Sequence, residues 1–149
     1  MLLALTQDHR PEFFGTMNFQ VHEYNPYIRA LREIETTNLK ISSHIKPSEE
    51  AIYCSLTSYE RSKETGMLLC DDRIADALWE NPDVLRELFA QMPDKESLCL
   101  CFEGTVFRCK DNFLYIRCVH FYKGHFTNSY ITLSSKNTNT NFVSVVLQQ

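Results

Sequence analysis

Residues 97–133 read SLCLCFEGTVFRCKDNFLYIRCVHFYKGHFTNSYITL, and this stretch decides the fold of the chain. Its apolar and aromatic residues form three runs, separated at Asp111-Asn112 and at Lys123-Gly124. Asn, Asp and Gly tolerate the backbone angles that a tight reversal needs. We therefore expect three successive strands, over Leu98–Arg108, Phe113–Lys123 and Thr127–Ser134. A fourth run, Asn141–Leu147, is expected to close the sheet.

The central strand of this set is apolar or aromatic on both of its faces. One face carries Phe113, Tyr115, Arg117, Val119 and Phe121, and the other carries Leu114, Ile116, Cys118, His120 and Tyr122. An antiparallel strand with one face in water normally alternates apolar with polar residues. Both faces therefore need a cover. Helices of this chain can cover one face, and the second cover is either more of this chain or another protein.

The length and composition indicate a single globular domain over residues 1–149. Hydrophobic residues make up 44% of the chain and charged residues 23%, which is ordinary for a globular protein. The net charge is -4 and no basic stripe is present, which argues against direct nucleic-acid contact. No run approaches the ~18 apolar residues of a membrane span, so we expect no membrane partner.

Two segments before the strands have helical character. Met67–Trp79 is expected to be a helix, with Asp71 and Asp72 near its positive end and Trp79 as a core anchor. Asp83–Met92 has two interpretations. Local propensity favours a helix, whereas a strand there would form a hairpin with Leu98–Arg108.

The remaining segments are expected to be short elements and loops. Met1–His9 is interpreted as the end of a helix, Glu12–Val21 as a strand, Tyr27–Ile34 as a short helix, and Thr36–Glu50, Tyr59–Gly66 and Ser134–Asn141 as polar loops. Ala51–Tyr59 is ambiguous between a strand and a turn-rich segment. Together with the sheet, these elements predict the α+β class.

The chain lacks the sequence patterns of common catalytic and metal sites. It contains no HExxH, GxSxG, P-loop or GxGxxG sequence. Cys118 and His120 share a strand face at ~7 Å and are interpreted as ordinary sheet residues. The six cysteines lack zinc-site spacing and are expected to be free, buried, small apolar side chains. We therefore expect no catalytic residue, no metal and no cofactor.

Arg117 stands in the middle of the central strand, among aromatic residues. An arginine in such a place usually has an acidic or an aromatic partner. It is either part of an internal ion pair or the polar anchor of a protein interface, and the sequence leaves both open.

Three segments match a known family. Arg73–Val84, RIADALWENPDV, is similar to a helix followed by a proline-containing turn and an Asp-Val that opens a strand. Leu98–Arg108, LCLCFEGTVFR, is similar to a strand ending in Gly-Val-Phe-Lys, although Gly104 lies one place early. Phe113–Phe121 is similar to a strand with an aromatic-Arg-aromatic face. These segments resemble the nuclear transport factor 2-like domain of the TAP/NXF nuclear RNA export factors, whose Asn-Asp before the last strand is Asn128-Ser129 here.

The resemblance implies a strongly bent antiparallel sheet of four to six strands wrapped around two or three helices. It also implies a non-catalytic domain that forms a heterodimer, sheet against sheet, with a small NXT-type cofactor of the same fold. Such a pair can bind nucleoporin Phe-Gly repeats, and some insect members resemble adaptors in small-RNA-guided transposon silencing. Both roles imply a nuclear location.

The residues that face a partner are expected on the central strand. They are either Ile116, Cys118, His120 and Tyr122, or the opposite set Tyr115, Arg117 and Phe121. The alternative function is small-molecule binding or catalysis in an internal cavity of a similar cone-shaped fold. Tyr53, Tyr115 and Asp76 are available for such a cavity.

Overall fold

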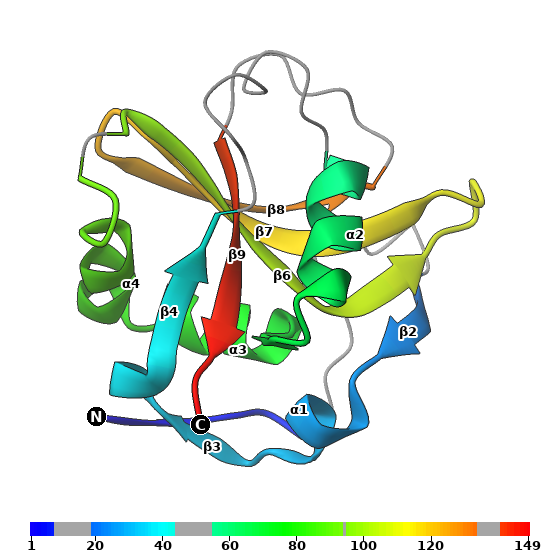
Figure 1. Ribbon diagram of the computed structural model, residues 1–149, viewed down its shortest axis with the longest axis horizontal. Helices are drawn as coiled ribbons and strands as arrows, with labels where there is room; N and C mark the ends of the chain where they lie inside the picture. Colours follow the sequence, from blue (N-terminus) through cyan, green and yellow to red (C-terminus); the bar gives the residue numbers. More distant parts are fainter. Residues whose placement is uncertain (8–18, 44–54, 94, 134–140) are drawn as a thin grey trace.

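The computed structural model describes residues 1–7, 19–43, 55–93, 95–133 and 141–149 of the chain. These residues contain a two-stranded sheet, a seven-stranded sheet and four α-helices (Figure 1). The strands are β1 (Leu2–Ala4), β2 (Gln20–Tyr24), β3 (Glu33–Glu35), β4 (Leu39–Ser42), β5 (Leu68–Leu69), β6 (Ser97–Arg108), β7 (Leu114–Tyr122), β8 (His125–Thr132) and β9 (Asn141–Leu147). The helices are α1 (Pro26–Ala30), α2 (Ser55–Glu64), α3 (Asp72–Trp79) and α4 (Pro82–Phe89), and a 3-10 turn spans Thr36–Asn38.

The larger sheet is built on the predicted meander of β6, β7 and β8, which pair antiparallel. The strand order is β4-β9-β6-β7-β8, with β2 paired to the far half of β6 and β5 paired to β9. β9 runs parallel to β6, with Leu98 opposite Asn141, so the prediction of a purely antiparallel sheet is wrong. Apolar alternation has the same period in either direction and therefore does not encode strand direction. The α+β class is confirmed, with a mixed sheet of seven strands.

Gly104 allows a second backbone to cross β6 at close range. A Cβ atom at this position would lie 2.3 Å from the carbonyl oxygen of Leu69 and 2.9 Å from that of Cys70. The Gly104 N–H donates to the Cys70 carbonyl at 2.9 Å, and the Gly104 carbonyl accepts from the Asn25 N–H at 3.0 Å. A side chain here would therefore push the β5 segment away from the sheet.

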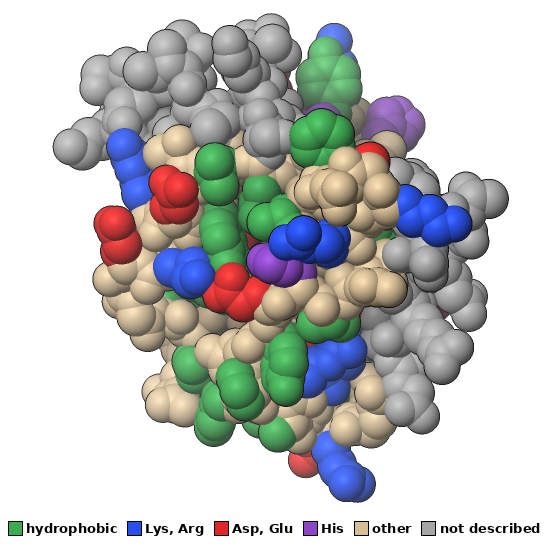
Figure 2. Space-filling view, turned by 90° about the vertical axis from the view of Figure 1, so that its right-hand side faces the viewer, with side chains coloured by type: hydrophobic (Ala, Val, Ile, Leu, Met, Phe, Trp, Pro, Cys, Tyr) green, Lys and Arg blue, Asp and Glu red, His purple; other side chains and the backbone are tan. Residues whose placement is uncertain are grey.

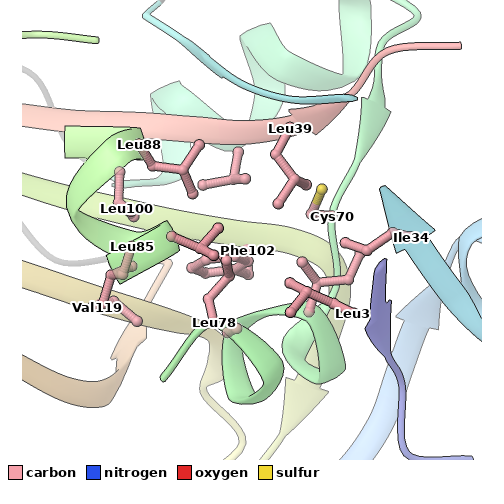
Figure 3. Packing of buried hydrophobic residues seen from close by; sticks show 14 of the residues in the cluster. Leu3, Ile34, Leu39, Cys70, Leu78, Leu85, Leu88, Leu100, Phe102 and Val119 are labelled. Carbon is pink, nitrogen blue, oxygen red and sulfur yellow. The ribbon is translucent and has the colours of Figure 1, made fainter. Parts of the chain in front are cut away.

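Side chains of β6 point alternately to the two faces of the sheet, so the core consists of two clusters. Leu98, Leu100 and Phe102 belong to one cluster, together with Val119 of β7 and side chains of α3 and α4. Figure 3 shows Leu100 and Phe102 near Leu78 of α3 and Leu85 of α4. Side chains that point to the other side of the sheet form a second cluster, which also contains Tyr59 of α2. This cluster includes Cys99, Cys101, Ile116, Cys118 and Phe142. The two faces predicted for the central strand are thus confirmed.

The second face is covered by this chain itself. α2 lies on that side, and its Ser62 Oγ is 2.7 Å from Ser144 Oγ of β9. Ser55 Oγ donates to the Thr132 carbonyl of β8 at 2.6 Å, at the other end of the helix. The sequence left open whether more of this chain or another protein covers the second face of the central strand. In the structure, α2 of this chain lies on that face.

Two predictions about the helical region are wrong, and one segment with two interpretations is now assigned. Tyr59–Gly66, expected as a surface loop, lies mostly in α2, whose buried residues are three serines and Tyr59 rather than an apolar stripe. Trp79 is 36% exposed, because its neighbour Leu78 takes the core position. Asp83–Met92 forms helix α4 with Pro82 at its start, so the strand interpretation is wrong. The Asp-Val match to the export-factor family fails with it.

The N-terminal predictions also need correction. Met1–His9 was expected as a helix end, but Leu2–Ala4 forms β1, with Leu3 opposite Ile34 of β3. The expected helix Tyr27–Ile34 ends at Ala30, and Leu39–Ser42 of the expected loop is strand β4. Residues 12–18 of the predicted strand Glu12–Val21, residues 44–54 and residues 134–140 lie outside the described part of the chain.

Candidate functional site

The seven candidate partner residues on β7 separate into a buried and an exposed group. Ile116, Arg117 and Cys118 are at most 1% exposed. Tyr115, His120 and Phe121 are partly exposed, and Tyr122 is 49% exposed. A partner that docks on the folded chain can touch only the second group, of which His120, Phe121 and Tyr122 lie together at the end of β7.

Arg117 is part of an internal ion pair. Its Nη2 donates to Asp76 Oδ1 of α3 at 2.9 Å, and its Nη1 donates to the Ser129 carbonyl of β8 at 3.2 Å. The guanidinium also lies 5.3 Å from the ring centroid of Tyr130. The side chain is fully buried, so the ion-pair interpretation is confirmed and Arg117 joins α3 to the sheet.

The residues considered for an internal ligand cavity do not meet. Tyr53 lies outside the described residues. Asp76 pairs with Arg117, and the Tyr115 hydroxyl donates to Asp111 Oδ2 at 2.7 Å near the β6–β7 turn. The hydrogen bond to Asp111 raises the pKa of Tyr115 to about 12. These groups therefore serve local contacts rather than one site.

Three aromatic rings meet where α4 approaches the β7–β8 hairpin, and we call this group, Phe89, Phe121 and Phe126, the aromatic corner. The ring centroids of Phe89 and Phe121 are 4.7 Å apart, and each lies 5.2 Å from that of Phe126. The corner forms one wall of a groove of about 400 Å³. Arg86 and Lys95 also line this groove, so an apolar wall and two cationic side chains are side by side.

The end of β7 continues the surface of the aromatic corner. His120 Nε2 lies 2.9 Å from Ser97 Oγ, and the His120 ring stacks on that of Tyr122 at 6.4 Å. Burial lowers the pKa of His120, so the imidazole is neutral at neutral pH. Lys123 Nζ lies 5.2 Å from the Tyr122 ring centroid. This surface is therefore aromatic with a cationic rim.

A second cavity, of about 370 Å³, lies beside α2 and is bordered by β2, β5 and β6; we call it the α2 pocket. Among the polar side chains that line this pocket, Glu23 accepts hydrogen bonds from two others. Glu23 Oε1 accepts from Lys63 Nζ and Glu23 Oε2 accepts from the Tyr59 hydroxyl, both at 2.7 Å. The Lys63 hydrogen bond lowers the pKa of Glu23, and burial and the bond to Glu23 raise that of Tyr59 to about 12. Figure 2 views the side of the molecule on which β2 and the β6–β7 turn lie, and acidic, basic, histidine and hydrophobic side chains are interspersed there.

Glu103 lies between α2 and β9 and also borders the α2 pocket. Its Oε1 accepts from Ser144 Oγ and, at 3.4 Å, from Ser62 Oγ. Its Oε2 is buried with no hydrogen-bond partner in the described residues. The side chain is 3% exposed, and burial raises the pKa of Glu103 to about 7. Glu103 therefore changes charge near neutral pH.

Sequence reasoning missed the α2 pocket, although one signal was present. Glu103 is the only carboxylate within the apolar run Leu98–Phe107. A buried strand that carries an acid must satisfy it with hydrogen bonds or keep it protonated. Its partners Ser62 and Ser144 are 41 residues away on either side and carry no local pattern.

The cysteines contribute packing. Cys70, Cys99, Cys101, Cys109 and Cys118 are buried thiols that form no disulfide. The hydrogen bond that Cys118 donates to Cys99, together with burial, raises the pKa of Cys118, which keeps the thiol protonated. Within the described ranges, no group of three or more His, Cys, Asp and Glu side chains is placed to hold a metal ion.

Comparison of the chain with protein-family models, with curated proteins and with solved structures finds no match. None of the helices in the described residues is long and apolar enough to cross a membrane.

Proposed function

We propose that the chain is a non-catalytic protein-interaction domain that binds its partner at the aromatic corner and the adjoining end of β7. One observation carries this proposal: Phe121, Phe126 and Tyr122 remain partly or largely exposed although the sheet behind them is covered by this chain. Exposed aromatic side chains beside arginine are typical of the centre of protein interfaces.

The kind of partner that we propose comes from the resemblance to the TAP/NXF export factors. Two of its three segments, Leu98–Arg108 and Phe113–Phe121, correspond to strands β6 and β7. On this basis we propose a nuclear transport factor 2-like cone and an NXT-type cofactor as the heterodimer partner. The domain then acts in nuclear RNA export, through nucleoporin Phe-Gly repeats, or as an adaptor in small-RNA-guided transposon silencing.

Co-expression with an NXT-type cofactor, followed by light scattering, tests this proposal. We expect a one-to-one complex that Tyr122→Ala weakens at least about tenfold, because truncating a central aromatic residue of an interface costs more than 1 kcal/mol. Tyr27→Ala is the matched control: Tyr27 is 50% exposed and Tyr122 49%, but Tyr27 lies on α1. A chain that stays monomeric with the cofactor contradicts the partner class. Equal effects of the two variants contradict the surface.

A second candidate function is small-molecule binding in the α2 pocket. The Glu23, Tyr59 and Lys63 cluster beside the buried Glu103 favours it, because ligand sites combine a cavity with a few convergent polar groups and perturbed pKa values. A fragment that raises the melting temperature of the wild type but not of Tyr59→Phe supports this function. A fragment panel without any such compound contradicts it.

A further inference from the structure

We propose that the α2 pocket binds a small organic cation, a primary ammonium group attached to an apolar group, with the ammonium group at Glu103. This inference rests on the second candidate function and deepens it, since it names the class of ligand that the same pocket takes. It is carried by a buried carboxylate oxygen without a partner, by the charges of the pocket lining and by its apolar wall.

One carboxylate oxygen in the pocket lining has no hydrogen-bond partner. Glu103 lines the pocket and is 3% exposed. Its Oε1 accepts from Ser144 Oγ and Ser62 Oγ, whereas its Oε2 is buried with no partner in the described residues. A buried, ionised carboxylate with an unpaired oxygen costs free energy. A ligand that donates a hydrogen bond and carries a positive charge would remove that cost.

The basic side chain of the pocket already has another partner. Among the described residues that line the pocket, Lys63 is the one cation, and its Nζ contacts Glu23 Oε1 at 2.7 Å. The Tyr59 hydroxyl also donates to Glu23, so neither donor satisfies Glu103 Oε2. With Glu23 and Glu103 ionised, the described lining holds two negative charges and one positive charge. It therefore complements a cation better than an anion.

The rest of the described lining is mostly apolar and suits the apolar group of such a ligand. Its apolar and aromatic members include Tyr24, Pro26, Met67, Leu68 and Leu69. Tyr24 is 53% exposed and Met67 45%, so a ligand would cover apolar surface that now lies in water. The volume of about 370 Å³ is in the range of small-molecule sites. The sequence neighbours of the lining residues, within 22–27, 58–70 and 102–105, all belong to the described part of the chain.

Binding of this cation depends on pH, because Glu103 has to release its proton first. Burial raises the pKa of Glu103 to about 7. The carboxyl group is therefore mostly protonated at pH 6 and mostly ionised at pH 8. The affinity for the cation should rise about tenfold between these two pH values, in proportion to the ionised fraction.

Other titratable groups surround Glu103 on three elements. They are Cys99 and Cys101 of β6, Tyr59 and Lys63 of α2, and Glu23 and His22 of β2. The hydrogen bond that Cys99 donates to Cys101 and burial raise the pKa of Cys99, and the pKa of Cys101 is also raised, because burial outweighs the effect of accepting that bond. The hydrogen bond to Glu23 raises the pKa of Lys63, and β5 and β9 carry no titratable side chain. His22 is the group whose titration has to be separated from that of Glu103.

An NMR titration of backbone amides with phenethylamine, phenethyl alcohol and phenylpropionate tests the inference. The three probes are similar in size and are positive, neutral and negative. At pH 8 we expect the amine to bind at least about tenfold more tightly than the alcohol, because it forms a charged hydrogen bond with Glu103. The largest shifts are expected at Gly66 and Gly104, which line the pocket. The affinity for the amine should fall about tenfold at pH 6, and that for the alcohol should not change.

Glu103→Gln should abolish both the preference for the amine and its pH dependence, because the amide has the same shape without the charge. The matched control is Glu64→Gln, which removes one charge at an exposed position of α2 outside the described lining and should preserve both. Thermal melts confirm that both variants fold. A Glu103→Gln chain that keeps the preference and the pH dependence assigns them to another group, such as His22, and overturns the inference.

This inference and the candidate function on which it rests fail in different ways. If the alcohol or phenylpropionate shifts the pocket amides at concentrations as low as the amine does, the pocket binds small molecules but the cation is wrong. Fragments that stabilise the wild type over Tyr59→Phe and are all neutral or anionic also overturn the cation. If no probe shifts these amides and no fragment stabilises the wild type, both the ligand class and the function of the pocket are wrong.

Discussion

The two faces of the large sheet are covered in physically different ways. On one face, leucine, valine and phenylalanine side chains of the sheet pack against the apolar sides of α3 and α4. On the other, α2 buries Ser55, Ser58, Tyr59 and Ser62, and meets Glu103 and Ser144. The first contact depends mainly on apolar area removed from water, which does not change with pH, and the Arg117–Asp76 ion pair adds to it. The second depends on hydrogen bonds and on the protonation of one carboxyl group.

The largest effect is expected at Arg117, the buried charge on the α3 side. Arg117→Glu places a carboxylate at a fully buried position beside Asp76, and breaking a buried ion pair in this way costs up to about 5 kcal/mol. Urea unfolding measures this loss. Arg32→Glu, at an exposed position, is the control and should change stability little. A folded, fully stable Arg117→Glu chain would show that the ion pair does not join α3 to the sheet.

Phe102→Ala tests whether the face that packs against α3 and α4 is stabilised by apolar burial. Phe102 is fully buried, so its truncation should cost about 4 kcal/mol through lost burial and the cavity left behind. The loss should be the same at pH 5 and pH 8. Phe113→Ala is the matched control, because Phe113 is 53% exposed and should cost less than about 1 kcal/mol. Similar losses at the two positions would contradict the core assignment.

Glu103→Gln tests the polar face through pH. The folded-state pKa of Glu103, about 7, lies above the reference value of 4.5. Between these values the folded state keeps a proton that the unfolded state has released, so this group makes stability fall as pH rises, by about 3 kcal/mol in total. The loss is complete above about pH 8 and absent below about pH 4.

We therefore expect Glu103→Gln to be more stable than the wild type at pH 8 and to have a flatter pH profile in chemical denaturation. Glu87→Gln, on the exposed side of α4, serves as the control and should keep the wild-type profile. Parallel profiles for Glu103→Gln and the wild type would contradict the raised pKa.

Ser62→Ala should have the smallest effect. It removes a hydrogen bond to the 3%-exposed Glu103 and the contact with Ser144, at a cost of about 1 kcal/mol. Because the Ser62 hydrogen bond lowers the pKa of Glu103, its removal should also move the pH-dependent loss to higher pH. Stability curves at several pH values measure both effects. A shift to lower pH would contradict this account of the polar face.

The contrast between the faces also explains which helices the sequence predicted. The helix predicted over Met67–Trp79 is right from Asp72 onward, where Asp71 caps α3, but Leu68–Leu69 forms β5. For Asp83–Met92 the sequence left helix and strand open, and the apolar residues at helical spacing favoured the helix that α4 forms. α2 was mistaken for a loop in its second half because its buried side is made of serines, which are typical of turns. The partner surface was predicted on β7, but the sequence did not distinguish the buried Arg117 from the exposed Tyr122.

The sequence by itself determined the β6–β7–β8 meander, the two faces of its strands and the buried state of its cysteines. These properties follow from a period of two and from turn residues, both of which act over a few neighbouring positions. Only the tertiary structure decided that α2 covers the second face, that β9 lies parallel to β6, and that Arg117 pairs with Asp76 rather than with a partner. These are contacts between residues 41 to 82 positions apart in the sequence, and residues that far apart leave no periodic signal in the chain.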